Sequence, residues 1–145
     1  QNFENTMSRL LELSVLPIIN ENDTVATEEI EIGDNDTLAA IVAQSVRADL
    51  LILLSDIDGL FDSDPRTNPT AKLIERVDDI EKYKDCAGGA GTDAGTGGMG
   101  AKLVAAEMVT SAGIPMFITN GERPEILYDV LEGSARGTYF VAEKN

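Results

Sequence analysis

The sequence lacks histidine altogether and contains a single cysteine, Cys86, among its 145 residues. Without histidine, a Ser-His-Asp or Cys-His catalytic group, an HExxH metal site and a histidine general base are all excluded. A single cysteine excludes an internal disulfide framework and a zinc site made of cysteines. Any chemistry must therefore depend on carboxylates, lysines, amides, hydroxyls and backbone N–H groups.

Positive charge is also scarce, because 11 Lys and Arg residues stand against 26 Asp and Glu residues, for a formal net charge of −15. Such a charge repels phosphate backbones and anionic lipid, so we expect neither a nucleic-acid nor a membrane partner. A local positive site for a small anion remains compatible with it. No apolar run approaches the ~18 residues that span a bilayer, and no signal peptide is present, so we expect a cytoplasmic protein.

Strand and helix patterns alternate along the chain, whose 43% hydrophobic content predicts a packed core. The apolar, β-branched segments predict strands at 15–19, 50–54, 72–77, 115–119 and 138–142. Helical spacing of apolar residues predicts helices at 3–13, 37–46, 101–112 and 125–131, the last two ended by Gly113 and Gly133. This alternation predicts a three-layer α/β/α sandwich with a mostly parallel sheet, whose ligands gather outside the carboxyl ends of the strands.

Glycines gather directly before the predicted helix 101–112, in the segment 95–102. Glycine lets the backbone approach a phosphate closely, and a helix N-terminus presents free N–H groups to it. Lys102 could place an ammonium on the same anion. The segment is no Walker A loop, because Ala101 stands where the lysine belongs, and no apolar strand precedes it as in a dinucleotide fingerprint. We interpret it as a phosphate-binding loop, with a surface loop and helix cap as the alternative.

Short amide and carboxylate side chains form two clusters, at 20–23 and 33–36, on either side of a hairpin expected at 25–32. Each cluster alone is typical of a turn or a helix N-cap. Their duplication around one hairpin favours a site for the ammonium and carboxylate of a small zwitterion, in which one carboxylate also holds neighbouring lysines.

The segments 17–25, 33–36, 53–61, 64–69 and 95–103 follow one another in an order that resembles the amino acid kinase family, and within it the members that phosphorylate glutamate. The resemblance runs from about residue 2 to 140. It implies that residues 1–145 are a single partial amino acid kinase domain, the C-terminal, nucleotide-binding part. In the family an N-terminal strand and a glycine-rich loop with a second phosphate-binding lysine precede this part, so we expect this chain alone to be a poor catalyst or inactive.

The resemblance also implies an activity: transfer of the γ-phosphoryl of ATP to the side-chain carboxylate of L-glutamate, giving glutamyl 5-phosphate, the first step of proline biosynthesis. It implies ATP and Mg²⁺ as cofactors, proline as a feedback inhibitor, and a homo-oligomer. A glutamate carboxylate, with a reference pKa of about 4.3, is ionised near neutral pH and needs no histidine base. The alternatives are a non-catalytic nucleotide-binding α/β module and an inactive fragment.

Site residues are assigned by the resemblance, position by position, with no metal ligand among them. Lys102 is the catalytic lysine that neutralises the migrating phosphoryl, and Asp36 is the organising carboxylate, with Asp34 as the alternative. The residues that would bind glutamate are Asn20, Asp23 and Asn35. The residues that would bind the nucleotide are Ser55, Asp56, Thr96, Gly97, Gly98, Met99, Gly100, Ala101 and Lys102. Ser55 stands where the family has threonine, and keeps the hydroxyl.

Overall fold

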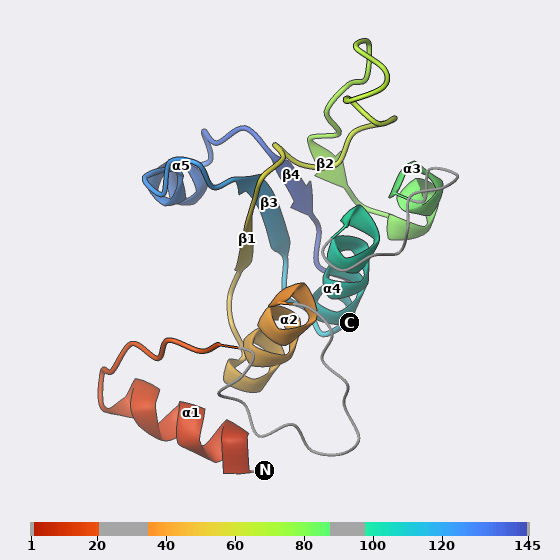
Figure 1. Cartoon of the computed structure of the whole chain (residues 1–145). Coiled ribbons are helices and arrows are strands. Elements are labelled where there is room, and N and C mark those ends of the chain that lie inside the picture. Colours follow the sequence, from red (N-terminus) through yellow and green to blue (C-terminus); the bar gives the residue numbers. More distant parts are fainter. Residues whose placement is uncertain (1, 21–34, 88–97, 145) are drawn as a thin grey trace.

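The computed structural model describes residues 2–20, 35–87 and 98–144, which form one sheet with helices on both of its faces (Figure 1). The helices are α1 (Asn2–Glu12), α2 (Asn35–Val46), the 3-10 helix η2 (Ile80–Tyr83), α3 (Lys84–Ala87), α4 (Met99–Ser111) and α5 (Ile126–Glu132). The strands are β1 (Leu51–Ser55), β2 (Arg76–Val77), β3 (Met116–Asn120) and β4 (Thr138–Phe140). The expected hairpin at 25–32 lies outside the described residues.

The sheet has the strand order β1-β3-β4-β2. β1 pairs with β3 in parallel, so that Leu51 lies opposite Met116 and Ser55 opposite Asn120. β2 and β4 are also parallel, whereas β3 and β4 are antiparallel. The predicted α/β fold with a mostly parallel sheet is therefore confirmed. The antiparallel pairing has a consequence for the site, because the beginning of β4 lies at the edge of the sheet where β1 and β3 end.

The hydrophobic core lies between the sheet and the two helices α2 and α4, which lie side by side on one face (Figure 1). Small buried residues allow these two helices to approach each other closely; among them are Ala40, Ala43, Ala105 and Ala106. Gln44 Nε2 donates a hydrogen bond of 2.8 Å to the carbonyl oxygen of Met108 and ties α2 to α4. α5 lies on the other side of the sheet and completes the third layer (Figure 1).

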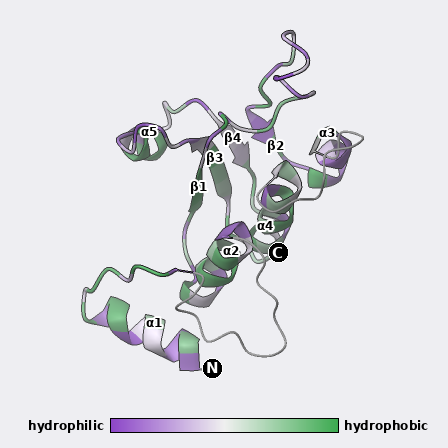
Figure 2. Cartoon of the chain, viewed as in Figure 1, coloured by the Kyte–Doolittle hydropathy of each residue, from purple (hydrophilic) through white to green (hydrophobic). Residues whose placement is uncertain are grey.

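The segment 15–19 differs from its prediction, because the structure gives it no regular secondary structure. Its apolar side chains reach solvent: Leu16 is 84% and Ile18 91% exposed. Figure 2 shows this hydrophobic stretch turning at the end of α1 and running back toward α2. The β-branched pattern favours a strand, but a strand also needs a hydrogen-bonding neighbour. No described strand pairs with this segment, so the predicted strand is wrong.

The remaining elements follow the predictions within a few residues. Gly113 and Gly133 have φ angles of +85° and +80°, as expected for glycines that end helices. The helix predicted at 101–112 begins two residues earlier, because α4 starts at Met99. The predicted strand 72–77 shrinks to β2, with an isolated bridge between Phe61 and Leu73. None of the helices in the described ranges is long and apolar enough to cross a membrane.

Candidate functional site

The N-terminal ends of α2 and α4 lie at the same edge of the sheet as the carboxyl ends of β1 and β3 (Figure 1). Each helix leads into its strand through a short turn, so it runs back along the sheet and begins where the strand ends. A helix N-terminus exposes unpaired N–H groups and the positive end of the helix dipole. This edge therefore combines two positive helix ends with the polar turns that follow β1 and β3.

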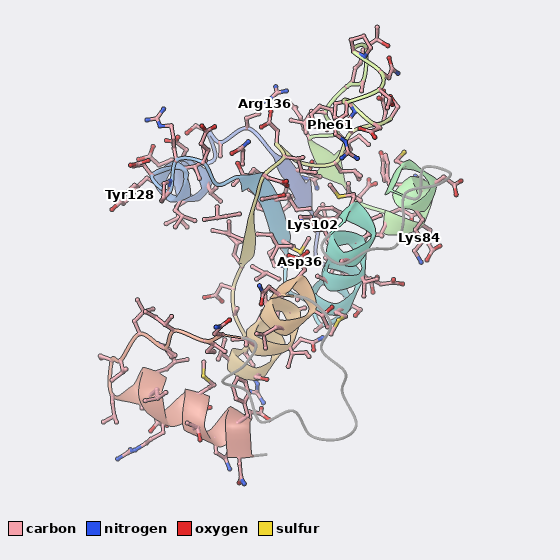
Figure 3. All side chains as sticks on the ribbon, viewed as in Figure 1. Asp36, Phe61, Lys84, Lys102, Tyr128 and Arg136 are labelled. Atoms are coloured by element: carbon pink, nitrogen blue, oxygen red, sulfur yellow. The ribbon has the colours of Figure 1, made fainter. Side chains whose placement is uncertain are left out.

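Lys102 and Asp36 meet at this edge, although 66 positions separate them in the sequence. Lys102 Nζ donates a hydrogen bond of 3.1 Å to Asp36 Oδ2, and the two side chains are only 9% and 17% exposed. Figure 3 shows them facing each other between α2 and α4. Asp36 lies in the first turn of α2, where a carboxylate is favourable next to the helix dipole. The pair links the first turns of the two helices.

The position of Lys102 is unfavourable for its own helix, because a cation near the N-terminus of α4 opposes the helix dipole. The partly enclosed ammonium is also removed from most of its hydration, which the Asp36 carboxylate offsets. A helix that needed only stability would place a lysine at its other end. Lys102 therefore lies at a helix N-terminus, where a cation is disfavoured. At this position an anionic group would meet the N-terminal ends of both helices.

The beginning of α4 is open. Its N-cap residue is Gly98, which has extended backbone (φ −76°, ψ 177°) and no side chain with which to cap the helix. A Cβ atom on Gly100 would meet none of the described atoms within 4 Å, so the first turn of α4 has open space beside this residue. The backbone N–H groups of Ala101 and Lys102 reach the Gly98 carbonyl oxygen at 3.1 and 3.4 Å. Such a helix start suits a phosphate group.

The turn after β1 begins with Ser55 and Asp56. The Ser55 hydroxyl accepts a hydrogen bond of 3.3 Å from the Ile57 N–H and donates one of 3.3 Å to Asp56 Oδ1. The Ser55 carbonyl oxygen accepts a hydrogen bond of 2.8 Å from the Gly121 N–H, which holds the turn against the residue after β3. A Cβ on Gly121 would lie 2.7 Å from Leu54 Cβ, so the residue after β3 can lie this close to β1 only if it is glycine.

Asp58 joins the same edge through two hydrogen bonds that the sequence did not predict. Its Oδ1 accepts from Asn120 Nδ2 at 3.2 Å and its Oδ2 from Arg136 Nε at 3.1 Å. Arg136 lies beyond the carboxyl ends of β1 and β3 (Figure 3). The acidic turn around Asp58 was visible in the sequence, whereas Arg136, a lone arginine before a short strand, carried no signal.

The structure brings two of the predicted site residues into contact and places others at the same edge of the sheet. Lys102 and Asp36 are in contact, Asn35 begins α2 directly before Asp36, and Ser55 and Asp56 end and follow β1. The start of α4 contains the predicted residues Gly98, Met99, Gly100 and Ala101. Asn20 is described and exposed, at the end of the segment that follows α1. The predicted residues outside the described ranges are Asp23, Asp34, Thr96 and Gly97.

Comparison with known proteins identifies the family. The family described as "Amino acid kinase family" matches residues 1–120, so the chain belongs to the amino acid kinase family. The chain is 58% identical over 144 residues to a protein of Clostridium tetani (strain Massachusetts / E88) named "Glutamate 5-kinase". This match covers 99% of this chain and 54% of that protein. It is 52% identical over 143 residues to "Glutamate 5-kinase 2" of Bacillus subtilis (strain 168), covering 98% of this chain and 38% of the relative. The chain spans about half the length, or less, of the curated relatives it matches.

Solved structures share the fold at low sequence identity. "Carbamate kinase from Giardia lamblia bound to AMP-PNP" has a TM-score of 0.68 at 22% identity, over 97% of this chain and 44% of that chain. "Crystal structure of UMP kinase from Ureaplasma parvum" has a TM-score of 0.64 at 22% identity, over 95% of this chain and 52% of that one. At this level of identity the likeness shows the fold alone.

Proposed function

We propose that this chain is the nucleotide-binding part of a glutamate 5-kinase, a single partial amino acid kinase domain in a longer enzyme. The enzyme transfers the γ-phosphoryl of ATP to the side-chain carboxylate of L-glutamate and forms glutamyl 5-phosphate, the first step of proline biosynthesis. The observation that carries this proposal is the Lys102–Asp36 pair between two helix N-termini. The names of the relatives, at 47–58% identity over nearly the whole chain, support the choice of substrate.

Lys102 supplies the positive charge that the transferring phosphoryl group needs. Phosphoryl transfer depends on positioning and charge neutralisation more than on covalent help from the protein. Lys102 Nζ lies at the open start of α4, where the first N–H groups of the helix add to the same positive field. In this proposal the ammonium moves its hydrogen bonds toward the phosphoryl oxygens as their charge spreads in the transition state.

Asp36 holds Lys102 in place. Its carboxylate fixes the ammonium from the side of α2, at 3.1 Å. The acceptor carboxylate of glutamate is already ionised near neutral pH, so Asp36 has no proton to remove from it. We therefore assign Asp36 an organising role, and assign Asn35, Asn20 and Asp23 to the ammonium and α-carboxylate of glutamate.

The nucleotide phosphates are assigned to the start of α4, together with Ser55 and Asp56 at the end of β1. Thr96 and Gly97 complete this proposed phosphate site. Within the described ranges, no group of three or more Cys, Asp and Glu side chains could hold a metal by itself. Protein sites for nucleotide-bound Mg²⁺ need only one or two carboxylates, because the nucleotide phosphates supply the other ligands. When bound, Mg²⁺ neutralises charge on the β- and γ-phosphate oxygens.

Further properties belong to the complete enzyme. We propose that it works in the cytoplasm, forms a homo-oligomer and is inhibited by proline, as the resemblance to the glutamate-phosphorylating members of the family implies. These properties can be examined on the complete protein by size-exclusion chromatography with light scattering and by initial rates measured with added proline.

The proposed activity is tested by trapping the acyl phosphate. The complete protein that contains this chain is incubated with ATP, Mg²⁺, L-glutamate and hydroxylamine, and glutamyl hydroxamate is measured. We expect hydroxamate that depends on both ATP and L-glutamate, with little from L-aspartate, whose side chain is one methylene shorter. Absence of ATP-dependent hydroxamate, from a protein whose circular dichroism spectrum shows that it is folded, would refute the proposed activity.

A further inference from the structure

The carboxylate of Asp58 connects three separate segments at the edge of the sheet where β1 and β3 end. Asp58 itself lies in the turn after β1. One of its oxygens accepts a hydrogen bond from Asn120, the last residue of β3, and the other from Arg136, in the segment that leads to β4. Since β4 is antiparallel to β3, all three segments meet at the edge that we assign to the nucleotide.

Both partners of Asp58 are themselves held firmly. Asn120 Oδ1 accepts a hydrogen bond of 2.9 Å from the Glu122 N–H, which fixes the orientation of its amide. The Arg136 carbonyl oxygen accepts one of 2.7 Å from the hydroxyl of Thr119, a residue that is 1% exposed. The next residue, Gly137, lies so close to β3 that a Cβ on it would come within 2.2 Å of the Ile118 carbonyl oxygen. Asp58 is therefore attached to the fixed amide of Asn120 and to the side chain of a residue whose backbone is fixed.

The turn that contains Asp58 is anchored at its two ends, and between them Asp56 is exposed whereas Asp58 is half-buried. Ser55 pairs within the sheet, opposite Asn120. Leu60 is 1% exposed, and its N–H donates a hydrogen bond of 2.9 Å to the Thr138 hydroxyl. Between these anchors, Asp56 is exposed and Asp58 supplies side-chain contacts to the neighbouring segments. The Ser55 and Asp56 side chains are oriented by their own hydrogen bonds within the turn, and Asp58 ties the backbone of that turn to the two neighbouring segments.

The energy of these contacts is too small to explain them by stability alone. The side chains of Arg136 and Asp58 are 66% and 38% exposed, and ion pairs of this kind contribute about 0–1 kcal/mol. A small displacement of a binding turn has much larger consequences for a ligand, because its groups must meet the ligand at hydrogen-bonding distance. The Asp58 carboxylate, which accepts hydrogen bonds from two other segments, helps to fix the position of the turn.

We propose that Asp58 is a positioning residue that holds the Ser55–Asp56 turn in the shape that binds the nucleotide. The inference rests on the proposed nucleotide site, and it adds Asp58, with Arg136 and Asn120, to the residues that determine ATP affinity. Loss of the Asp58 carboxylate weakens ATP binding about tenfold, which corresponds to about 1.4 kcal/mol of binding energy. We expect affinity for the amino acid to stay unchanged, because the hydrogen bonds of Asp58 go to Asn120 and Arg136, and neither of these is assigned to glutamate.

The test uses the complete protein that contains this chain, with the substitutions Asp58→Ala, Asp58→Asn and Arg136→Ala. The control is Glu12→Ala, which removes the same charge and a comparable exposed carboxylate–arginine pair, Glu12–Arg9, whose side chains are 66% and 71% exposed. Equilibrium dialysis with ATP and no glutamate gives Kd, steady-state rates give KM for both substrates, and thermal unfolding gives Tm.

We expect Asp58→Ala to raise Kd and KM for ATP about tenfold, with KM for glutamate and Tm near those of the control. Asp58→Asn keeps one acceptor and is expected to fall in between. Arg136→Ala combined with Asp58→Ala should be no worse than Asp58→Ala alone, because both act through one contact.

An unchanged Kd for ATP in Asp58→Ala overturns the inference, as does an equal rise of KM for both substrates with a lowered Tm. Failure of the proposed function has a different signature. If the unsubstituted protein binds ATP but forms no glutamyl phosphate, the activity is refuted while the dialysis measurements still decide the role of Asp58. If the unsubstituted protein binds no ATP, the nucleotide site and the inference are both refuted.

Discussion

Two ion pairs lie at the same edge of the sheet, and both have a nitrogen–oxygen distance of 3.1 Å. The side chains of Lys102 and Asp36 are 9% and 17% exposed, whereas those of Arg136 and Asp58 are 66% and 38% exposed. The first pair joins two packed helices, and the second joins two surface segments. Equal geometry therefore does not imply equal energy, because the surrounding solvent determines what is lost when a partner is removed.

Removal of one charged side chain is expected to affect the two ion pairs differently. In the enclosed pair, the remaining charge stays in a medium of low polarity with little water to replace its partner. In the exposed pair, water takes the place of the missing group, and only the orientation of the turn is lost. We therefore expect substitutions in the first pair to affect both stability and turnover, and substitutions in the second to affect ligand affinity.

The largest expected effect belongs to Lys102→Ala. It removes the charge assigned to the phosphoryl group, so we expect kcat to fall by about 10²–10³, the range for loss of one group that stabilises transition-state charge. It also leaves the Asp36 carboxylate without its ammonium, which we expect to cost about 1–3 kcal/mol of folding free energy, below the range for fully buried pairs. Hydroxamate assays and urea unfolding measure the two effects, and a variant with full activity would contradict the assignment of Lys102.

Asp36→Asn is expected to have the next largest effect. The amide has the same shape and can accept a hydrogen bond from Lys102, but it no longer neutralises the ammonium. We expect kcat to fall by about 10–100-fold, because the lysine is less well positioned, while the lost folding free energy stays at about 1 kcal/mol. The matched comparison is Asp58→Asn at the exposed pair. If both variants change only the ATP affinity, the difference in burial has no functional meaning.

The sequence predicted most elements near this site because their patterns are local. The helices at 37–46 and 101–112 and the strands at 50–54 and 115–119 lie within two residues of α2, α4, β1 and β3 at each end. Their apolar spacing reflects the core that they share. By contrast, 15–19 has the composition of a strand, but pairing depends on a neighbour far away in the chain, which composition does not reveal.

The site shows the same limit. The glycines before α4 were sufficient to predict a phosphate site with Lys102, since a helix start is a local feature. The partnership of Lys102 with Asp36 is not local, and only the family resemblance indicated that both belong to one site. Arg136 was missed because its meaning comes from the antiparallel β4, which brings the residue to the edge where β1 ends. The short η2 helix was missed for a related reason: its start depends on a cap from Asp79 to the Glu81 N–H rather than on apolar spacing.

A smaller effect is expected from Gly121→Ala, which changes the turns near the exposed Arg136–Asp58 pair and leaves the Lys102–Asp36 pair unaltered. The added Cβ would lie 2.7 Å from Leu54 Cβ, so the turn after β3 must move away from the turn after β1. We expect a loss of about 1–2 kcal/mol in unfolding free energy, as for other overpacked sites. Gly100→Ala is the control for stability, because its Cβ would meet nothing within 4 Å. Equal unfolding midpoints for the two variants would show that the contact at Gly121 is not tight.

The smallest effect is expected at a third ion pair, Arg66 and Asp64, which extends the comparison to a contact remote from the helix ends. Arg66 Nε lies 3.1 Å from Asp64 Oδ1, and Arg66 is 79% exposed. The hydrogen bond from the Arg66 side chain, with a second one from its backbone N–H, lowers the pKa of the Asp64 carboxyl below its ordinary value.

A lowered carboxyl pKa in the folded state stabilises the protein at pH values above the ordinary pKa of about 4, and this contribution disappears as the pH falls through the lowered value. Arg66→Gln keeps a polar side chain and removes the cation. We therefore expect the variant to unfold at a slightly lower Tm than the unsubstituted protein at pH 7, and the difference to vanish on acidification to about pH 2. ATP affinity should not change. A Tm difference that grows toward acid pH would reverse the sign of this linkage, and would mean that the pair does not favour the ionised carboxylate.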